Sequence, residues 1–576
     1  MSAARRTGVP LAWVLLAACG EQTEPQAGST SEAPPASLYF VDATAGSGLE
    51  FVKNRSGGAD KDYVSESFGA GVALFDFNAD GHLDLYLVGG GVHELDPAQA
   101  PPRDRLLKGD GSGHFTDVTL AAGIGSTGWS YGVRAEDLDG DGWCDLYVTA
   151  NGPNTYWRNL GGGIFENATA KAGIAGSVWS TGAVALDYDM DGDLDLWVVN
   201  HIDFDRAAID AEHKRNTYLE QTVYFGPSGL PPLADTLYRN LGDGTFEDVS
   251  AGAGILDPPL FGFQAVVLDA DMDGLPDVYV ANDSQPNQLW RNKGDGTFED
   301  TALRAGAALS MEGGPQAGMG VAVGDADGDG IADLFVTNFS EDYFTFYRGD
   351  GKGRFKDITR RARLMQATIE SLGWGAAFHD FDQDGDLDLF TANGHVFPQM
   401  DAVPAGPGYK QLDLIFENLG QGRFQIPNGD GGPGLALRGA SRGVACGDVD
   451  GDGDLDLVVT HLDGTPSLLL NQGEALGQVL QVQLVGSAGN RRAIGARLVA
   501  QVGERSIARF AGSQQGFLSS DAHLIHFGLG AAQSVERLDV YWPDGSLESF
   551  EKLAAGQRVR IQKGAGVVDQ VPIKQP

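Results

Sequence analysis

Short apolar runs recur along the chain, each followed by an acidic segment and then by a second apolar run. The first runs include GVALF at 71–75, GAVAL at 182–186 and GVACG at 443–447. The second runs, such as LDLYLV at 83–88 and LDLWVV at 194–199, contain many β-branched and aromatic residues. Short runs of this composition, bounded by turn residues, predict β-strands.

A third and a fourth strand are predicted after each pair. Segments such as LYRNLGDGTFEDV at 237–249 and LWRNKGDGTFEDT at 289–301 place a glycine-rich turn between two short strands, which is typical of a β-hairpin. The four-strand unit occurs seven times. Its acidic segments begin at Asp76 and, six repeats later, at Asp448, a period of about 62 residues that indicates a repeat array.

The seventh unit lacks its fourth strand. Its third strand ends at Asn471, whereas an extra copy, FVDAT at 40–44, precedes the first unit. The N-terminal strand is therefore expected to complete the last unit and close a ring of seven four-stranded blades, a β-propeller. The predicted fold class is all-β: a seven-bladed β-propeller over 38–471, a small C-terminal β domain of about six strands over 475–565, and a tail over 566–576.

Ordered motifs in the C-terminal region resemble a known family. They are AIGAR at 493–497, FLSS at 517–520, HFGLG at 526–530 and YWPDG at 541–545. This series looks like the ASPIC and UnbV domain that follows a propeller in the bacterial cartilage-acidic-protein-like family. The four-strand units resemble the FG-GAP and VCBS repeats of integrin-type propellers. The resemblance implies the same two-part architecture but names no ligand and no agreed activity.

Each acidic segment has nine residues, with acids or their amide at positions 1, 3, 5 and 9 and glycine at 6. Side chains at 1, 3 and 5 of a tight loop converge on one point, and position 7 adds a backbone carbonyl. Oxygen ligands alone favour Ca²⁺, up to seven ions here. An EF-hand is excluded because position 12 lies in a strand and is never Glu. Solvated acidic turns without metal are the alternative.

The predicted metal ligands, loop by loop, are Asp76, Asn78, Asp80, His82 and Asp84; Asp137, Asp139, Asp141, Trp143 and Asp145; Asp187, Asp189, Asp191, Asp193 and Asp195; Asp269, Asp271, Asp273, Leu275 and Asp277; Asp325, Asp327, Asp329, Ile331 and Asp333; Asp380, Asp382, Asp384, Asp386 and Asp388; and Asp448, Asp450, Asp452, Asp454 and Asp456. The formal net charge is −39. Such a surface repels phosphate backbones, so nucleic acid is excluded as a partner.

The N-terminus predicts an address outside the cytoplasm. Arg5 and Arg6 precede an apolar stretch, 9–18, that is too short to span a bilayer and indicates a signal peptide over 1–18. Leu16-Ala17-Ala18-Cys19 resembles a bacterial lipobox, which implies a lipidated Cys19 and a flexible tether over 19–37. The protein is then expected outside the cytoplasm, at the outer membrane, in the periplasm or at the cell surface. It would contact a membrane only through the lipid. An ordinary signal peptide with an incidental cysteine is the alternative.

The face opposite the acidic loops is the predicted place for a ligand. Aromatic and polar side chains around a propeller mouth suit a carbohydrate, peptide or small molecule. The candidates are Trp129, Trp179, Asn200, His201, Asn282, Asn338, Trp374, Asn393, His395 and His461. The alternative is that Asn and His cap strand ends there. An excursion at 202–235 is expected on this face, as a lid or a decorated loop.

The sequence favours a binding or adhesion module for a protein or carbohydrate over an enzyme. Neither an HExxH motif nor a nucleophile elbow occurs. An active site on the predicted mouth, built from His201, His395 and His461, is the alternative. The remaining cysteines, Cys144 and Cys446, are expected to be two separate buried thiols.

Overall fold

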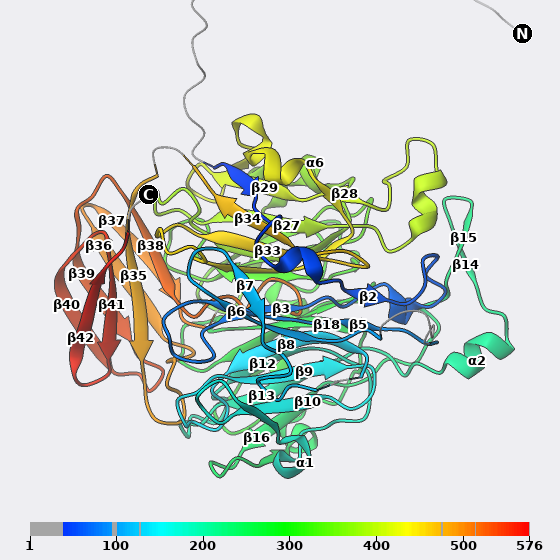
Figure 1. Cartoon of the computed structure of the whole chain (residues 1–576), viewed down its shortest axis with the longest axis horizontal. Coiled ribbons are helices and arrows are strands. Elements are labelled where there is room, and N and C mark those ends of the chain that lie inside the picture. The colour runs from blue at the N-terminus through cyan, green and yellow to red at the C-terminus, as the bar shows by residue number, and fades with distance from the viewer. Residues whose placement is uncertain (1–37, 95–100, 126–127, 474–475, 513, 575–576) are drawn as a thin grey trace, which may run out of the picture. The chain divides into compact units, whose positions relative to one another are not determined.

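The computed structural model describes residues 38–94, 101–125, 128–473, 476–512 and 514–574. Within them the fold is all-β apart from short helices, and it consists of repeated four-stranded blades and a C-terminal domain (Figure 1). That part of the prediction is confirmed. The predicted signal peptide, the tether and the lipidated Cys19 lie outside the described residues.

Seven antiparallel sheets of four strands, here called blades one to seven, are found between 40 and 471 in the described residues. From the first strand outward they are β3 (Val72–Phe75), β4 (Asp84–Leu87), β6 (Arg105–Gly109), β7 (Phe115–Asp117); β8 (Ser130–Glu136), β9 (Asp145–Ala150), β10 (Thr155–Asn159), β11 (Phe165–Asn167); β12 (Ser180–Leu186), β13 (Asp195–Asn200), β16 (Thr236–Asn240), β17 (Phe246–Asp248); β18 (Gly262–Leu268), β19 (Asp277–Asn282), β20 (Gln288–Asn292), β21 (Phe298–Asp300); β22 (Val321–Gly324), β23 (Asp333–Val336), β24 (Thr345–Gly349), β25 (Phe355–Asp357); β26 (Gly373–His379), β27 (Asp388–Asn393), β29 (Leu414–Asn418), β30 (Phe424–Gln425); and β32 (Ser441–Gly447), β33 (Asp456–His461), β34 (Ser467–Asn471), β1 (Phe40–Asp42).

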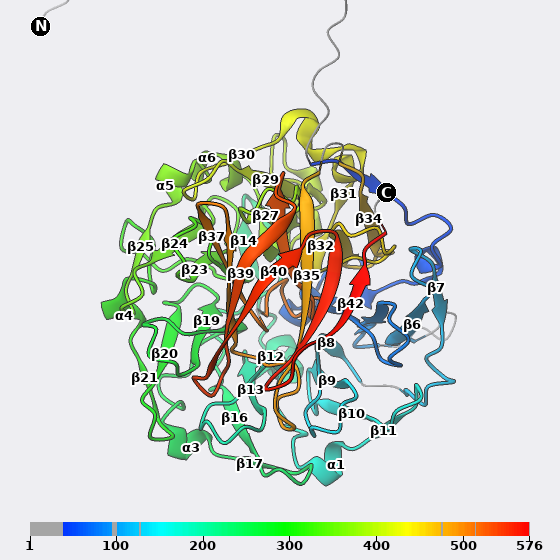
Figure 2. The same ribbon diagram turned by 90° about the vertical axis from the view of Figure 1, so that its left-hand side faces the viewer.

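The N-terminal strand β1 belongs to the last blade. It pairs antiparallel with β34, Phe40 opposite Asn471. The first strand of each blade contacts that of the next blade, and β32 of blade seven contacts β3 of blade one. Figure 2 shows outer strands such as β11, β17, β21 and β25 around the rim, with strands of the C-terminal domain in front of the middle. Apolar side chains fill the space between neighbouring blades; between blades six and seven they include Phe40, Phe381 and Phe390.

Short helices follow four of the outer strands. They are α1 (Thr169–Ala172), α3 (Ser250–Ala253), α4 (Ala302–Ala305) and α5 (Thr359–Ala362), and α6 (Met365–Thr368) comes after α5. An Asp or Asn at the strand end starts each turn: Asp248, for example, accepts a hydrogen bond from the N–H of Ser250 at 3.0 Å. Such side chains satisfy N–H groups that the first helical turn leaves without a partner.

The C-terminal domain consists of two four-stranded sheets packed face to face around an apolar core. Its strands are β35 (Gln478–Val485), β36 (Arg497–Val502), β37 (Arg505–Phe510), β38 (Ile525–Gly530), β39 (Ser534–Tyr541), β40 (Leu547–Ala554), β41 (Gln557–Gln562) and β42 (Gly566–Pro572). The prediction of about six strands ending near 565 was wrong. The segment that was assigned to the tail pairs with β41 as an eighth strand.

The loop that joins β37 to β38 lies among the first strands of the blades. In this central loop (511–524, of which 513 is not described), the carbonyl of Leu518 accepts from the N–H of Val133 in blade two at 3.0 Å. Ser520 donates its N–H to Val72 of blade one at 2.8 Å, and Gly516 accepts from Val444 of blade seven at 2.8 Å. The C-terminal domain is thus hydrogen-bonded into the middle of the blades.

The rest of the described chain forms short helices and three two-stranded sheets. The excursion 202–235 forms α2 (Arg206–Ala211) and a hairpin, β14 (Asn216–Tyr218) with β15 (Gln221–Val223). The remaining elements are η1 (Leu49–Phe51), β2 (Arg55–Ser56), η2 (Val64–Glu66), β5 (Gly90–Gly91), η3 (Pro398–Ala402), β28 (Gln411–Leu412), η4 (Asn428–Gly431), η5 (Pro433–Ala436) and β31 (Arg438–Gly439).

Truncating Phe40 tests whether β1 is part of the core of the last blade. Its side chain is fully buried and packs edge-on against Phe381, with ring centroids 5.5 Å apart. We expect Phe40→Ala to lower the free energy of unfolding by about 3–5 kcal/mol in denaturant titrations. Phe51→Ala, at an 84% exposed position, is the matched control and should change it by less than about 0.5 kcal/mol. Equal effects of the two substitutions would place β1 outside the core.

Candidate metal loops

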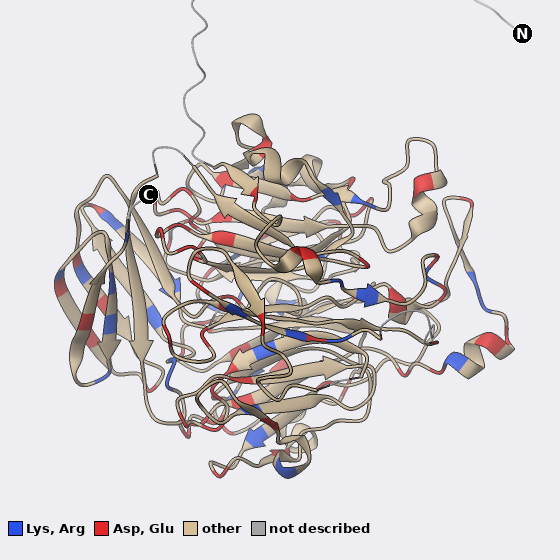
Figure 3. Ribbon diagram, viewed as in Figure 1, with Lys and Arg blue, Asp and Glu red and all other residues tan. Residues whose placement is uncertain are grey.

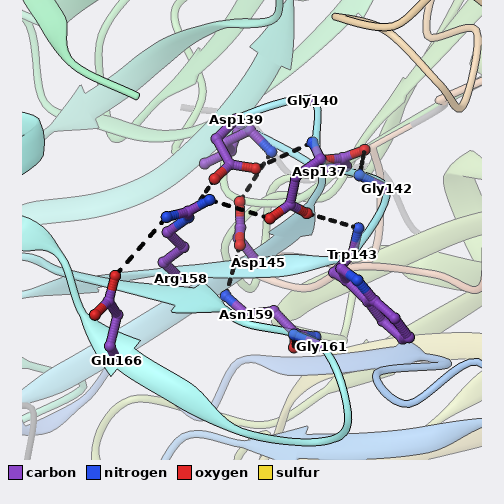
Figure 4. Close-up of polar contacts among 12 residues, drawn as sticks. Asp137, Asp139, Gly140, Gly142, Trp143, Asp145, Arg158, Asn159, Gly161 and Glu166 are labelled. Atoms are coloured by element: carbon purple, nitrogen blue, oxygen red, sulfur yellow. Dashed lines mark hydrogen bonds and ion pairs between the residues drawn. The ribbon is translucent and has the colours of Figure 1, made fainter. Parts of the chain in front are cut away.

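Each of the seven acidic loops joins the first and second strands of its blade. In blade two, Asp137, Asp139 and Asp145 place carboxylate oxygens within 4.8 Å of one another (Figure 4). Gly142, at loop position 6, has φ 98°, a backbone conformation that glycine adopts without steric cost, and its N–H donates to Asp137 at 2.9 Å. The same convergence occurs in blades three, four and five, where the groups are Asp187, Asp189 and Asp195; Asp269, Asp271 and Asp273; and Asp325, Asp327 and Asp333.

The aspartate at position 9 is the fixed point of every loop. In blade two Asp145 is fully buried and accepts from the N–H of Leu138 at 3.1 Å and from the N–H of Asn159 in the third strand at 2.7 Å. The same two hydrogen bonds occur in all seven blades, on Asp84, Asp145, Asp195, Asp277, Asp333, Asp388 and Asp456. Position 9 therefore ties the loop to the third strand whether or not a metal is bound.

The asparagine of the third strand also links each loop to the preceding blade. Asn159 donates from Nδ2 to the carbonyl of Phe77, in the acidic loop of blade one, at 2.9 Å. The corresponding residues that do the same are Asn240, Asn292, Asn418 and Asn471. Blades one and five have glycine at this position, Gly109 and Gly349. The sequence carried part of this signal as the Arg-Asn pairs at 158–159, 239–240 and 291–292. The role of the asparagine became clear only once the neighbouring blade was placed.

Unpartnered oxygens show that the loops suit a cation. Among buried side-chain oxygens without a hydrogen-bond partner in the described residues, every aspartate oxygen belongs to one of the acidic loops. They lie on Asp137, Asp187, Asp189, Asp271, Asp327, Asp380, Asp450 and Asp454. A buried acceptor without a partner costs free energy, and a cation held by several of them removes that cost. Loop one contributes none, in keeping with Asn78 at its position 3.

Arginine and lysine side chains of the third strands are drawn into several loops. In blade two Arg158 pairs with Asp139 and lies 3.2 Å from Asp141 (Figure 4). The corresponding pairs are Lys108 with Asp80 at 2.9 Å, Arg291 with Asp277 at 2.9 Å, and Arg348 with Asp329 at 2.8 Å. Arg348 is the first residue of an Arg-Gly-Asp sequence. Its guanidinium is engaged within the blade by the ion pairs with Asp327 and Asp329.

Blades six and seven have Glu417 and Leu470 where the other blades have a cation. There the C-terminal domain supplies the positive charge, and Figure 3 shows Lys and Arg on its strands beside acidic loops. Arg509, 8% exposed, lies 3.2 Å from Asp380 at the start of loop six. Arg558 lies 3.7 Å from Asp448 at the start of loop seven.

Burial holds the position-9 carboxyls near the neutral form when no cation is present. It raises the pKa of Asp84 to about 7, that of Asp195 to about 8 and that of Asp277 to about 7. A bound cation stabilises the charged form and so opposes this shift. The loops therefore fit a divalent ion with oxygen ligands. The role of the backbone carbonyl at position 7 as a ligand remains a prediction.

The face opposite the acidic loops differs from the expected open mouth. Of the candidate ligand residues, Trp129 and His461 are half-buried and the other eight are buried. They pack with Phe517 and Leu518 of the central loop and with residues of 202–235, such as Tyr224. Segments distant in sequence therefore cover most of the side chains that were predicted as a possible ligand face.

The asparagines on this face cap strand ends, which was the alternative interpretation. Asn200 donates from Nδ2 to the carbonyl of Ala234 at 2.8 Å, and Asn393 to that of Leu412 at 2.9 Å. Asn282 and Asn338 likewise bond the carbonyls of Pro286 and Tyr343. The Nδ2 groups of these amides are therefore committed to the backbone, whereas Oδ1 of Asn282, Asn338 and Asn393 has no hydrogen-bond partner in the described residues.

The three histidines of the alternative active site are engaged separately. His201 bonds the carbonyl of Gly262 through Nδ1 at 3.1 Å, and His395 accepts from the N–H of Phe397 at 3.1 Å. His461 contacts the hydroxyls of Ser441 and Ser467. Burial lowers the pKa of His201 and of His395 to about 3, so neither ring is suited to acid–base exchange near neutral pH.

The cysteine prediction is confirmed. Cys144 and Cys446 are both free, and both are buried.

Comparisons with known proteins agree with this domain arrangement. Residues 76–148, 137–198, 269–336 and 325–391 match FG-GAP-like repeats, and residues 486–568 match the ASPIC and UnbV family. The chain has the FG-GAP and ASPIC/UnbV architecture. It is homologous to cartilage acidic protein 1, with 29% identity to the Xenopus tropicalis protein over 47% of this chain and 28% identity to the human protein over 49%. The matched region spans 40% of the length of each of these relatives.

Two lectins are among the solved structures that align with this chain. The one from Burkholderia pseudomallei gives 11% identity and a TM-score of 0.41, covering 70% of this chain and 97% of the lectin. The one from Agrocybe aegerita gives 18% identity and a TM-score of 0.36, covering 64% and 88%. Both scores are too low to establish a shared fold. Separately, no helix in the described part of the chain has the length and apolar character needed to cross a bilayer.

Replacing Asp413 tests the cost of a buried carboxylate next to the covered face. Asp413 accepts from the N–H of Asn393 at 2.8 Å, a role that Asn154 and Asn287 have in blades two and four. Burial raises the pKa of Asp413 to about 7. The folded state then binds this proton more tightly than the unfolded state, so the contribution of Asp413 to stability falls as pH rises from about 4 to about 7. Asp413→Asn should remove that fall.

We therefore expect the free energy of unfolding of Asp413→Asn to increase relative to that of the unsubstituted protein as pH rises from 5 to 8. The increase should be up to about 1.4 kcal/mol per unit of pKa difference. Urea titrations at the two pH values measure it. Asp350→Asn, in an exposed hairpin turn, is the control and should follow the unsubstituted protein. Parallel pH profiles for Asp413→Asn and the unsubstituted protein would show that burial does not shift this carboxyl.

Proposed function

We propose that this chain is a Ca²⁺-stabilised binding module, built as a seven-bladed β-propeller with a C-terminal β domain and held outside the cytoplasm. The observation that carries the metal assignment is the set of unpartnered buried aspartate oxygens, all of which lie in the acidic loops in the described residues. Oxygen ligands without sulfur or imidazole favour Ca²⁺. Loop positions 1, 3, 5 and 9 would hold the ion, which supplies positive charge and cross-links the loop.

The ring assignment is supported by the contacts between successive first strands and by the pairing of β1 with β34. Closure in this way joins the two ends of the repeat array and leaves only the short outer strand of each blade as an edge. The predicted lipid anchor at Cys19 would place the module at a membrane surface. This part of the proposal rests on the sequence alone.

Homology to cartilage acidic protein 1 and the lack of a clustered catalytic set among the candidate histidines favour a binding role over an enzymatic one. The partner that we propose is a protein or a carbohydrate. Because the central loop fills the middle of the blades and 202–235 covers the opposite face, a partner would contact exposed side chains of these covering segments.

Chelation tests the metal assignment. Elemental analysis of the full chain should give several Ca²⁺ per molecule, up to seven, and EDTA should lower Tm. At a Ca²⁺ concentration about 100 times the Kd, each site adds about 2.7 kcal/mol to the free energy of unfolding. A metal-free protein with an unchanged Tm in EDTA would mean that the acidic loops are solvated turns.

A pair of variants in blade three assigns the ion to a loop. Asp189→Asn, at loop position 3, should remove about one Ca²⁺ and lower Tm in Ca²⁺. In EDTA it should not lower Tm, because it relieves repulsion between carboxylates. Asp243→Asn, in the hairpin turn of the same blade, should change neither quantity. Loss of calcium in both variants would contradict a site confined to the loop.

An exposed position in the covering excursion tests the binding role. Leu219 is 39% exposed at the turn of the β14–β15 hairpin, and Leu303 is 73% exposed on α4. Calcium-loaded protein should bind saturably on printed glycan or peptide arrays. We expect Leu219→Asp to weaken that binding by about tenfold, or 1.4 kcal/mol. The control variant Leu303→Asp should leave the binding unchanged. If no array feature binds saturably, a structural surface component replaces the module as the assignment.

A further inference from the structure

A second group of metal-ligating side chains lies at the ends of the strands that lead into acidic loops six and seven. His379 of β26, Cys446 of β32 and Asp521 of the central loop place a ring nitrogen, a sulfur and a carboxylate oxygen within 4.8 Å of one another. Cys446 is 2% exposed and Asp521 is 9% exposed. Three segments that are far apart in sequence, two from the blades and one from the C-terminal domain, thus bring three different ligand types to one point.

His379 Nε2 lies 3.1 Å from two polar atoms, Nε2 of Gln515 and Oδ2 of Asp521. Gln515 has its amide orientation fixed by Phe378, whose N–H donates to Oε1 at 3.0 Å and whose carbonyl accepts from Nε2 at 3.2 Å. Nε2 of Gln515 is therefore a donor, and it lies 3.1 Å from Nε2 of His379. The same ring nitrogen lies 3.1 Å from Oδ2 of Asp521, which can only accept when it is ionised.

One nitrogen cannot both accept from the amide and donate to the carboxylate. A divalent ion held by His379 Nε2 and Asp521 Oδ2 would replace the hydrogen between these two atoms, because both then direct lone pairs at a positive charge. The Gln515 amide keeps its hydrogen bond to the Phe378 carbonyl. Oδ1 of Asp521 keeps its hydrogen bond from the N–H of Cys446 at 2.9 Å, which orients the carboxylate beside the sulfur.

We propose that Cys446, His379 and Asp521 bind Zn²⁺ or a chemically similar transition-metal ion that joins the C-terminal domain to blades six and seven. Thiolate and imidazole ligands select Zn²⁺ over Ca²⁺, so this site differs in kind from the acidic loops. The thiolate and the carboxylate together balance the two positive charges of the ion. Binding releases the thiol proton of Cys446 to water.

Cobalt provides the test, since a thiolate bound to Co²⁺ gives a near-ultraviolet charge-transfer band that carboxylates do not give. The full chain is stripped of metal under reducing conditions, supplied with excess Ca²⁺ to occupy the acidic loops, and titrated with Co²⁺ both when folded and during refolding from urea. We expect the band to saturate at one equivalent of Co²⁺ and to disappear when Zn²⁺ is added.

Matched variants assign the band. Cys446→Ala should abolish it, whereas Cys144→Ala, which removes the other buried thiol, should leave it unchanged. Asp521→Asn and His379→Gln keep the thiol, and each should weaken Co²⁺ binding by more than the roughly 10- to 100-fold that loss of an outer-shell partner costs. These two variants decide the matter if Cys446→Ala does not fold by circular dichroism.

The absence of a thiolate band in the unsubstituted protein overturns the proposal, as does a band that survives in Cys446→Ala. Failure here leaves the calcium assignment standing, because bound Ca²⁺ is counted independently. Conversely, a chain that binds no calcium but still gives the cobalt band would contradict the calcium assignment and support the thiolate site.

Discussion

The buried aspartate at the start of the second strand of every blade is the group on which the arrangement of the loops depends. Its two oxygens hold the N–H of the second loop residue and an N–H of the third strand, so one side chain fixes a loop and two strands. In five blades the third-strand residue that donates to it is an asparagine, which also bonds the loop of the preceding blade. Loop geometry and the contact between blades are therefore set by the same few atoms.

Those aspartates are buried beside other carboxylates, which creates a demand for positive charge. The chain meets that demand differently along its length. Third-strand Lys and Arg side chains enter the loops of blades one, two, four and five. Blades six and seven lack such a cation, and there Arg509 and Arg558 arrive from the C-terminal domain. The domain thus supplies a cation to the two blades that lack one in the third strand, and its Arg491 also lies 3.7 Å from Asp137 of blade two.

Local features of the chain were predictable from the sequence because they repeat and depend on neighbouring residues. The strands, the hairpins and the convergence of acids in the loops follow from periodicity, from turn glycines such as Gly142 and from the 1, 3, 5, 9 spacing. The free N-terminal strand could be matched to the incomplete last unit by counting. The eighth strand of the C-terminal domain was missed because Gly566–Pro572 has little apolar periodicity and depends on β41 for its pairing.

The covered face could not be predicted, because its composition is compatible with either exposure or burial. Aromatic residues beside Asn and His suit a ligand site, and they equally suit a core whose polar groups cap strands. What decides between the two is long-range: Phe517 and Leu518 come from a loop of the C-terminal domain, and Tyr224 comes from an excursion in blade three.

That burial also changes what a ligand would need in order to bind. Opening the face would expose a large apolar cluster, including Phe68, Trp179, Phe263 and Trp374, to water, at about 25 cal/mol for each Å² uncovered. Burying a partner's surface on the existing exterior of 202–235 carries no such cost. Recognition by the outer surface of the covering segments is therefore favoured over entry into the middle of the blades.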